Sequence, residues 1–153
     1  MSTIVTLRTI LMADDDEDDR LMTAKAWKRC GAGAALGFVR DGEELMDYLR
    51  RRGKYSDPAS APRPALILLD LNMPRKDGRE ALREIRRDQA LCAIPIIVLT
   101  TSTADEDMSL VYALGANSFI SKPRTFQALT DVIDDLRKHW IEPVGAPPEG
   151  SFE

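Results

Sequence analysis

Residues 66–74, Leu66-Ile67-Leu68-Leu69-Asp70-Leu71-Asn72-Met73-Pro74, decide how this chain folds. The apolar run that ends at Leu69 predicts a strand buried on both faces, which is typical of a parallel sheet covered by helices. Asp70 follows where that run stops, and Pro74 and Gly78 turn the chain away. Open α/β sheets bind ligands at the carboxyl ends of their strands, so Asp70 is a candidate site residue. Taken alone, it could equally be a solvated turn aspartate.

The composition indicates one globular domain. The chain has 153 residues, of which 44% are hydrophobic, and 21 basic against 25 acidic residues give a net charge of −4. The absence of a basic block argues against sequence-independent binding to nucleic acid. No apolar run approaches the roughly 20 residues of a membrane span, and no signal-peptide pattern is visible. Cys30 and Cys92 fit no metal motif, so we expect buried thiols in a reduced cytoplasm and neither a nucleic-acid nor a membrane partner.

Apolar runs and helical stripes alternate along the chain. Strands are expected at about 8–13, 35–40, 66–69, 94–100 and 117–121, and helices at about 17–30, 43–52, 79–88 and 105–114. A last helix carries one apolar stripe, Phe126, Leu129, Ile133, Leu136 and Trp140. This alternation predicts an α/β fold with a parallel sheet between two layers of helices. We expect one domain over 1–140 and a Pro- and Gly-rich tail without regular structure over 141–153.

Six acidic residues follow the first expected strand, beginning at Asp14. Asp16 can cap the next helix, and acids in a first helical turn complement the helix dipole. The helix terminus and solvent are therefore expected to account for the acids from Asp16 to Asp19. An EF-hand is excluded, because Asp19 replaces the required glycine and Lys25 the bidentate glutamate. Asp14 and Asp15 remain unexplained by the helix.

Polar residues end four of the expected strands: Asp14 and Asp15, Asp70, Thr100 and Lys122. Neighbouring strands lie about 4.8 Å apart, so carboxylates from adjacent strands would converge on one ion. All-oxygen ligation suits Mg²⁺ or Mn²⁺. Lys122 and Thr100 could hold the oxygens of a phosphoryl group, and Asp70 is the natural nucleophile because carboxylates form acyl phosphates.

These features, in this order, resemble a response-regulator receiver domain over nearly the whole chain. The motifs are the acidic pair, Asp70 followed by x-Asn-Met-Pro, the strand-end Thr100 and Lys122-Pro123. A closer resemblance, to the small single-domain regulators of phytochrome-type histidine kinases, rests on Gly53-Lys54-Tyr55-Ser56-Asp57, Lys76-Asp77-Gly78-Arg79, Leu99-Thr100-Thr101-Ser102 and Trp140 before a proline-containing tail. The resemblance implies the flavodoxin-like (βα)5 fold, doubly wound, with strand order 2-1-3-4-5.

The resemblance also implies how the site residues divide their roles. Asp70 would accept the phosphoryl group and contact the metal, and Asp15 would be a direct ligand. Asp14 would act through water, and Asn72 through its backbone carbonyl. The implied cofactor is Mg²⁺ or Mn²⁺.

Further roles follow from the resemblance at the ends of the last two strands. Thr100 and Lys122 would contact phosphoryl oxygens, and the rotamer of Phe119 would follow Thr100. The bond between Lys122 and Pro123 resembles one that is cis in the family. Two positions depart from the common pattern: Arg124 stands where many receivers have an aromatic residue, and Phe119 replaces the common tyrosine.

The function implied is that of a single-domain response regulator. It would accept its phosphoryl group from a sensor histidine kinase of the phytochrome type and catalyse only its own phosphorylation and dephosphorylation. With no output domain in the pattern, we expect the signal to leave through a homodimer, a docked partner or a phosphotransfer protein. A phosphatase with an aspartate nucleophile usually needs a second acid two residues on, where this chain has Asn72. A scaffold that works without phosphate is disfavoured by the complete set of site residues.

The surface expected to change lies around the fourth helix. Met108 and Tyr112 are four residues apart and lie away from the stripe of Leu110 and Leu114, so both are expected to be exposed. Exposed apolar residues are also common without any function. The resemblance implies a homodimer face that combines Met108, Tyr112, Phe119 and Trp140.

Overall fold

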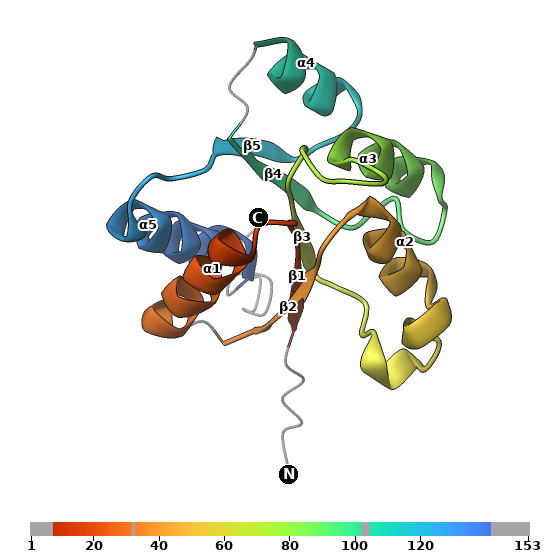
Figure 1. Cartoon of the computed structure of the whole chain (residues 1–153), viewed down its shortest axis with the longest axis horizontal. Coiled ribbons are helices and arrows are strands. Elements are labelled where there is room, and N and C mark those ends of the chain that lie inside the picture. The colour runs from red at the N-terminus through yellow and green to blue at the C-terminus, as the bar shows by residue number, and fades with distance from the viewer. Residues whose placement is uncertain (1–7, 32, 102–104, 142–153) are drawn as a thin grey trace, which may run out of the picture.

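The computed structural model describes residues 8–31, 33–101 and 105–141, which form a three-layer α/β fold (Figure 1). The strands are β1 (Thr9–Ala13), β2 (Ala35–Val39), β3 (Leu66–Leu69), β4 (Ile96–Thr100) and β5 (Ser118–Ser121). The helices are α1 (Glu17–Cys30), α2 (Gly42–Arg50), α3 (Gly78–Arg87), α4 (Asp105–Ala113) and α5 (Phe126–Leu136). All strand pairs are parallel, in the order β2-β1-β3-β4-β5, which confirms the expected fold.

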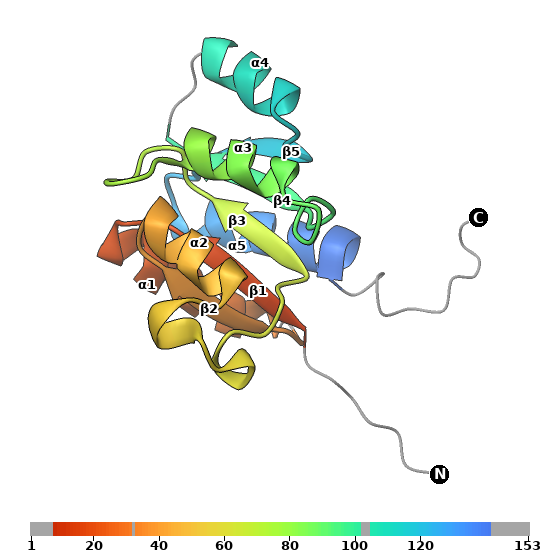
Figure 2. The same ribbon diagram turned by 90° about the vertical axis from the view of Figure 1, so that its right-hand side faces the viewer.

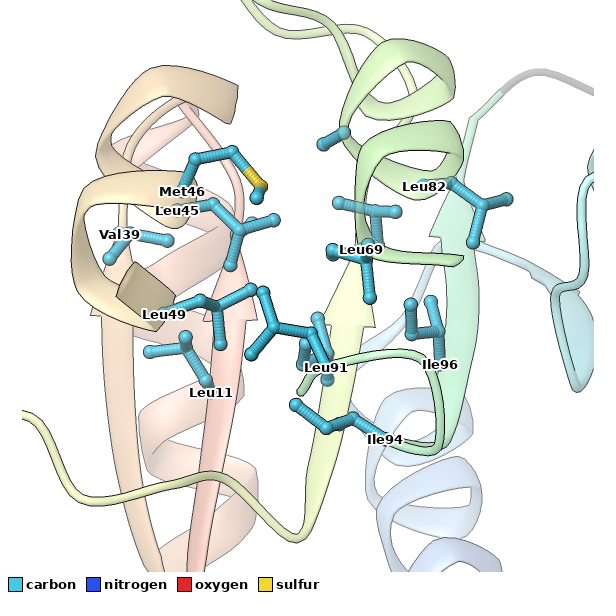
Figure 3. Close-up of a cluster of buried hydrophobic side chains, with 14 of the residues drawn as sticks. Leu11, Val39, Leu45, Met46, Leu49, Leu69, Leu82, Leu91, Ile94 and Ile96 are labelled. Atoms are coloured by element: carbon cyan, nitrogen blue, oxygen red, sulfur yellow. The ribbon is translucent and has the colours of Figure 1, made fainter. Parts of the chain in front are cut away.

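The central strands are apolar on both faces because each face carries a separate core. Ile67 and Leu69 of β3 belong to the cluster that α2 and α3 cover. Leu66 and Leu68 belong to the cluster under α1 and α5. Figure 3 shows the first cluster, with side chains of α2 and α3 packed onto the sheet. All four β3 side chains are fully buried, as the apolar run predicts.

Capping residues fix where the helices begin and end. Asp16 accepts hydrogen bonds from the N–H groups of Asp18 and Asp19, so α1 begins where expected. Gly31 ends α1 with φ of 65°, a left-handed conformation that favours glycine. Asp77 begins α3 with a capping box that Glu80 completes. These caps set the direction in which the chain leaves the carboxyl ends of β1 and β3.

Helix α4 lies beyond β5, next to α3 (Figure 2). Val111 is its buried residue, whereas Leu110 is 37% exposed, so the expected inward stripe of Leu110 and Leu114 is wrong for Leu110. The reason is rotation: α4 packs through Val111, and this turns Leu110 toward solvent. Met108 and Tyr112 are exposed, as expected.

Three other expectations differ from the structure. Cys92 is exposed and Cys30 half-buried, because the turn after α3 directs Leu91 and Ile94 inward and leaves Cys92 outside.

No described peptide bond is cis, so the bond between Lys122 and Pro123 is trans. The two isomers before proline differ by only about 0.5–1 kcal/mol, so the dipeptide itself does not decide between them.

The chain continues past α5 as one π-helical turn, Arg137–Ile141. Ile141, the first residue of the expected tail, is buried and belongs to this turn. Trp140 packs half-buried against the core under α1 and α5. The rest of the tail, from 142, lies outside the described residues. None of the described helices is long and apolar enough to cross a membrane.

Candidate functional site

The candidate site forms where the carboxyl ends of β1, β3, β4 and β5 meet. Ala13 pairs with Leu69 in the sheet, so the next residues, Asp14 and Asp70, emerge side by side. The N–H of Asp70 donates to the carbonyl of Ala13 at 3.0 Å, and the N–H of Lys122 donates to that of Thr100 at 2.8 Å. Strand register therefore brings the polar strand ends together.

Three carboxylates in this site have the chemistry of a divalent-cation site. Asp14, Asp15 and Asp70 each offer an oxygen within 4.8 Å of the other two. Asp14 is fully buried and Asp70 is 5% exposed, whereas Asp15 is exposed and leaves a side open to water. Oxygen ligands with several retained waters are what Mg²⁺ prefers, and Mn²⁺ accepts the same set. The residues present therefore fit such an ion.

The ammonium group of Lys122 lies among carboxylates. Its Nζ is 2.8 Å from Oδ2 of Asp14, 3.1 Å from Oδ2 of Asp70 and 2.7 Å from Oδ2 of Asp19. The Lys122 side chain is only 11% exposed, so these ion pairs are shielded from water. Lys122 thus neutralises part of the negative charge that the strand ends bring together.

For both Asp14 and Lys122, burial and the oppositely charged partner shift the pKa in opposite directions. Burial raises the pKa of Asp14 to about 6, although the Lys122 ammonium and the N–H of Asp16 pull it down and the charge of Asp70 adds to the rise. Burial alone would lower the pKa of Lys122, but hydrogen bonds to Asp14 and Asp19 raise it above its ordinary value. Lys122 therefore stays cationic, whereas burial disfavours the ionised form of Asp14.

The candidate nucleophile Asp70 is held at both carboxylate oxygens. Oδ1 accepts a hydrogen bond from the backbone N–H of Asn72 at 3.3 Å, and Oδ2 contacts Lys122. Thr100 is fully buried at the end of β4. The contacts with Asn72 and Lys122 orient the Asp70 carboxylate. Thr100 brings a hydroxyl group to the end of the neighbouring strand, β4.

The candidate switch residues lie outside this cluster. Phe119 on β5 is half-buried and packs on the core that also contains Val111 of α4. Met108 and Tyr112 lie on α4, and Trp140 lies after α5. The structure therefore separates the predicted residues into a strand-end site and a surface beyond it.

Sequence reasoning missed Asp19. Its helix position led us to assign it to the helix terminus and solvent, yet its carboxylate contacts Lys122 at 2.7 Å. Asp19 lies in the first turn of α1, and no local sequence signal indicates that this turn faces Lys122. Asp19 and Lys122 also line a cleft of about 250 Å³ with Thr101, Ser121, Pro123 and Arg124.

The chain is similar in sequence to known regulatory proteins. The family model described as the response regulator receiver domain matches residues 10–134. The response regulator Rcp1 of Synechocystis sp. is 36% identical over 140 residues, covering 92% of this chain and 93% of Rcp1.

Two solved structures extend the comparison. The phosphorylated cyanobacterial phytochrome response regulator RcpA is 37% identical, with a TM-score of 0.82 over 90% of this chain and 96% of RcpA. The Mn²⁺-bound form of Rcp1 is 36% identical, with a TM-score of 0.81 over 92% of this chain and 99% of that one.

Proposed function

The chain belongs to the response regulator receiver family, and from this we propose that it accepts a phosphoryl group on Asp70 from a phytochrome-type histidine kinase. The observation that carries this proposal is the position of Asp70, nearly buried between Lys122 and two further carboxylates. The phytochrome partner is inferred from the relatives Rcp1 and RcpA, the second of which is described as a phytochrome response regulator.

The chemistry that we propose is an in-line transfer. A carboxylate oxygen of Asp70 forms a bond to phosphorus while the bond from phosphorus to the kinase histidine nitrogen breaks, and the electron pair stays on that nitrogen. Lys122 and Thr100 bind the phosphoryl oxygens, and the N–H of Asn72 orients the other carboxylate oxygen. A bound Mg²⁺ or Mn²⁺, held by Asp14, Asp15, Asp70 and the Asn72 carbonyl, would supply neutralisation of the phosphoryl charge.

Phosphotransfer between purified proteins tests this function. A phytochrome-type histidine kinase, first labelled on its histidine from ATP, should pass its label to this chain in the presence of Mg²⁺. A histidine kinase without a phytochrome sensor serves as the control, and it should transfer more slowly. Equal transfer from both kinases would contradict the phytochrome partner, and no transfer from either would contradict the phosphoacceptor function.

We further propose that the signal leaves through a symmetric homodimer on the face of α4, β5 and α5. Met108 and Tyr112 are 39% and 47% exposed there. An apolar groove of about 150 Å³ between β5 and the end of α5 adds Ile120, Val132 and Trp140. Twofold symmetry is the commonest closed assembly.

Sedimentation of Tyr112→Glu tests the dimer. Because a twofold interface contains position 112 of both protomers, the substitution would bury two charges. The variant should therefore be monomeric at concentrations where the wild type is dimeric. Leu21→Glu, at a 53% exposed leucine on α1, is the matched control and should remain dimeric. A wild type that stays monomeric at high concentration, with and without phosphorylation, would contradict the homodimer.

A further inference from the structure

Lys122 contacts one carboxylate that belongs neither to the strand ends nor to the metal-ligand set. Asp19 lies in the first turn of α1, and its side chain is 38% exposed. Its Oδ2 nevertheless makes the shortest of the three Lys122 contacts, at 2.7 Å. Asp19 therefore contacts Lys122 from outside the three-carboxylate cluster.

The Lys122 ammonium contacts two of the three carboxylates that can hold a divalent cation. Nζ of Lys122 lies against Oδ2 of both Asp14 and Asp70, two of the three carboxylates that can hold the cation. Two positive charges held by the same carboxylates repel each other at such short range. Cation binding therefore requires Lys122 to give up part of its contact with Asp14 and Asp70.

Asp19 is held in a position to receive the displaced ammonium. Its backbone N–H donates to the Asp16 side chain at 3.3 Å, which fixes the first turn of α1. The cleft beside Asp19 and Lys122 gives the lysine side chain room to shift without leaving Asp19. Without Asp19, a displaced ammonium on a side chain that is 11% exposed would lose a carboxylate partner, at a cost in free energy.

We propose that Asp19 is a positioning residue that holds Lys122 while a divalent cation takes Asp14 and Asp70. Asp19 thereby favours cation binding without being a ligand, and it keeps the ammonium beside Asp70 for the incoming phosphoryl group. This inference deepens the proposed function and rests on the roles given there to Lys122 and Asp70.

Calorimetric titration with Mg²⁺ alone tests the inference, with no phosphate donor present. Asp19→Asn should weaken Mg²⁺ binding about five-fold, the scale of a partly exposed ion pair. Asp18→Asn is the matched control, because it removes the same charge from the same helical turn at an exposed position. Asp18→Asn should change the affinity by less than about two-fold, since salt screens exposed charges. Asp19→Glu restores the carboxylate and should recover much of the affinity.

Combining Asp19→Asn with Lys122→Met distinguishes positioning of the lysine by Asp19 from a direct effect of the Asp19 charge on the cation. Without the ammonium, Asp19→Asn should lower the Mg²⁺ affinity no more than Asp18→Asn does. A full Asp19→Asn effect in that background would overturn the proposal, and so would equal effects of Asp18→Asn and Asp19→Asn in the wild type. If circular dichroism shows that Lys122→Met does not fold, the Mg²⁺ affinity of Asp19→Glu decides instead, and failure to recover it would overturn the proposal. These titrations succeed or fail regardless of whether Asp70 becomes phosphorylated.

Discussion

Asp70→Asn is expected to abolish labelling by a small acyl-phosphate donor in the presence of Mg²⁺. The amide has nearly the shape of the carboxylate and can still accept from the N–H of Asn72, but it lacks the anionic oxygen that attacks phosphorus. Labelled phosphate incorporation, measured over time, should fall from the wild-type level to background. Circular dichroism should show the wild-type fold.

The matched control for this variant is Asp18→Asn. It makes the same chemical change at an exposed position on α1, so it should be labelled at close to the wild-type rate. Labelling of Asp70→Asn at the wild-type rate would show that another residue accepts the phosphoryl group.

Asp15→Asn is expected to weaken Mg²⁺ binding at least about ten-fold, since even residues that only orient a metal ligand have effects of that size. Asp15 is the exposed member of the three-carboxylate cluster, so its replacement removes a ligand without opening the core. Titration calorimetry measures the affinity, and phosphate incorporation at subsaturating Mg²⁺ should fall in parallel. An unchanged Mg²⁺ affinity would refute the role of Asp15.

The fold could be predicted from the sequence because its signals are local. The apolar run over Leu66–Leu69 is short and is followed by turn residues, which favours a strand buried on both faces. Asp16 and Gly31 mark both ends of α1. The location of the site could be predicted because parallel strands place their carboxyl ends at one edge of the sheet. Asp14, Asp70 and Lys122 converge because the strand order also places β1, β3, β4 and β5 side by side.

Features that depend on how a helix is rotated or seated could not be predicted. The contact between Asp19 and Lys122 joins residues 103 positions apart and depends on where α1 lies relative to β5. Leu110 and Val111 are neighbours of similar hydrophobicity, and only the packing of α4 decides which is buried. Sequence periodicity defines an apolar face, but the partner surface selects its orientation.

Locating the phosphoryl group on the wild-type chain shows whether Asp70 is the phosphoacceptor. The chain is incubated with Mg²⁺ and a small acyl-phosphate donor, reduced with borohydride to trap the acyl phosphate, digested and analysed by mass spectrometry. The trapped product, homoserine, is expected at Asp70 and at no other aspartate. Modification at Asp14, Asp15 or any other residue, or no modification in the presence of Mg²⁺, would contradict it.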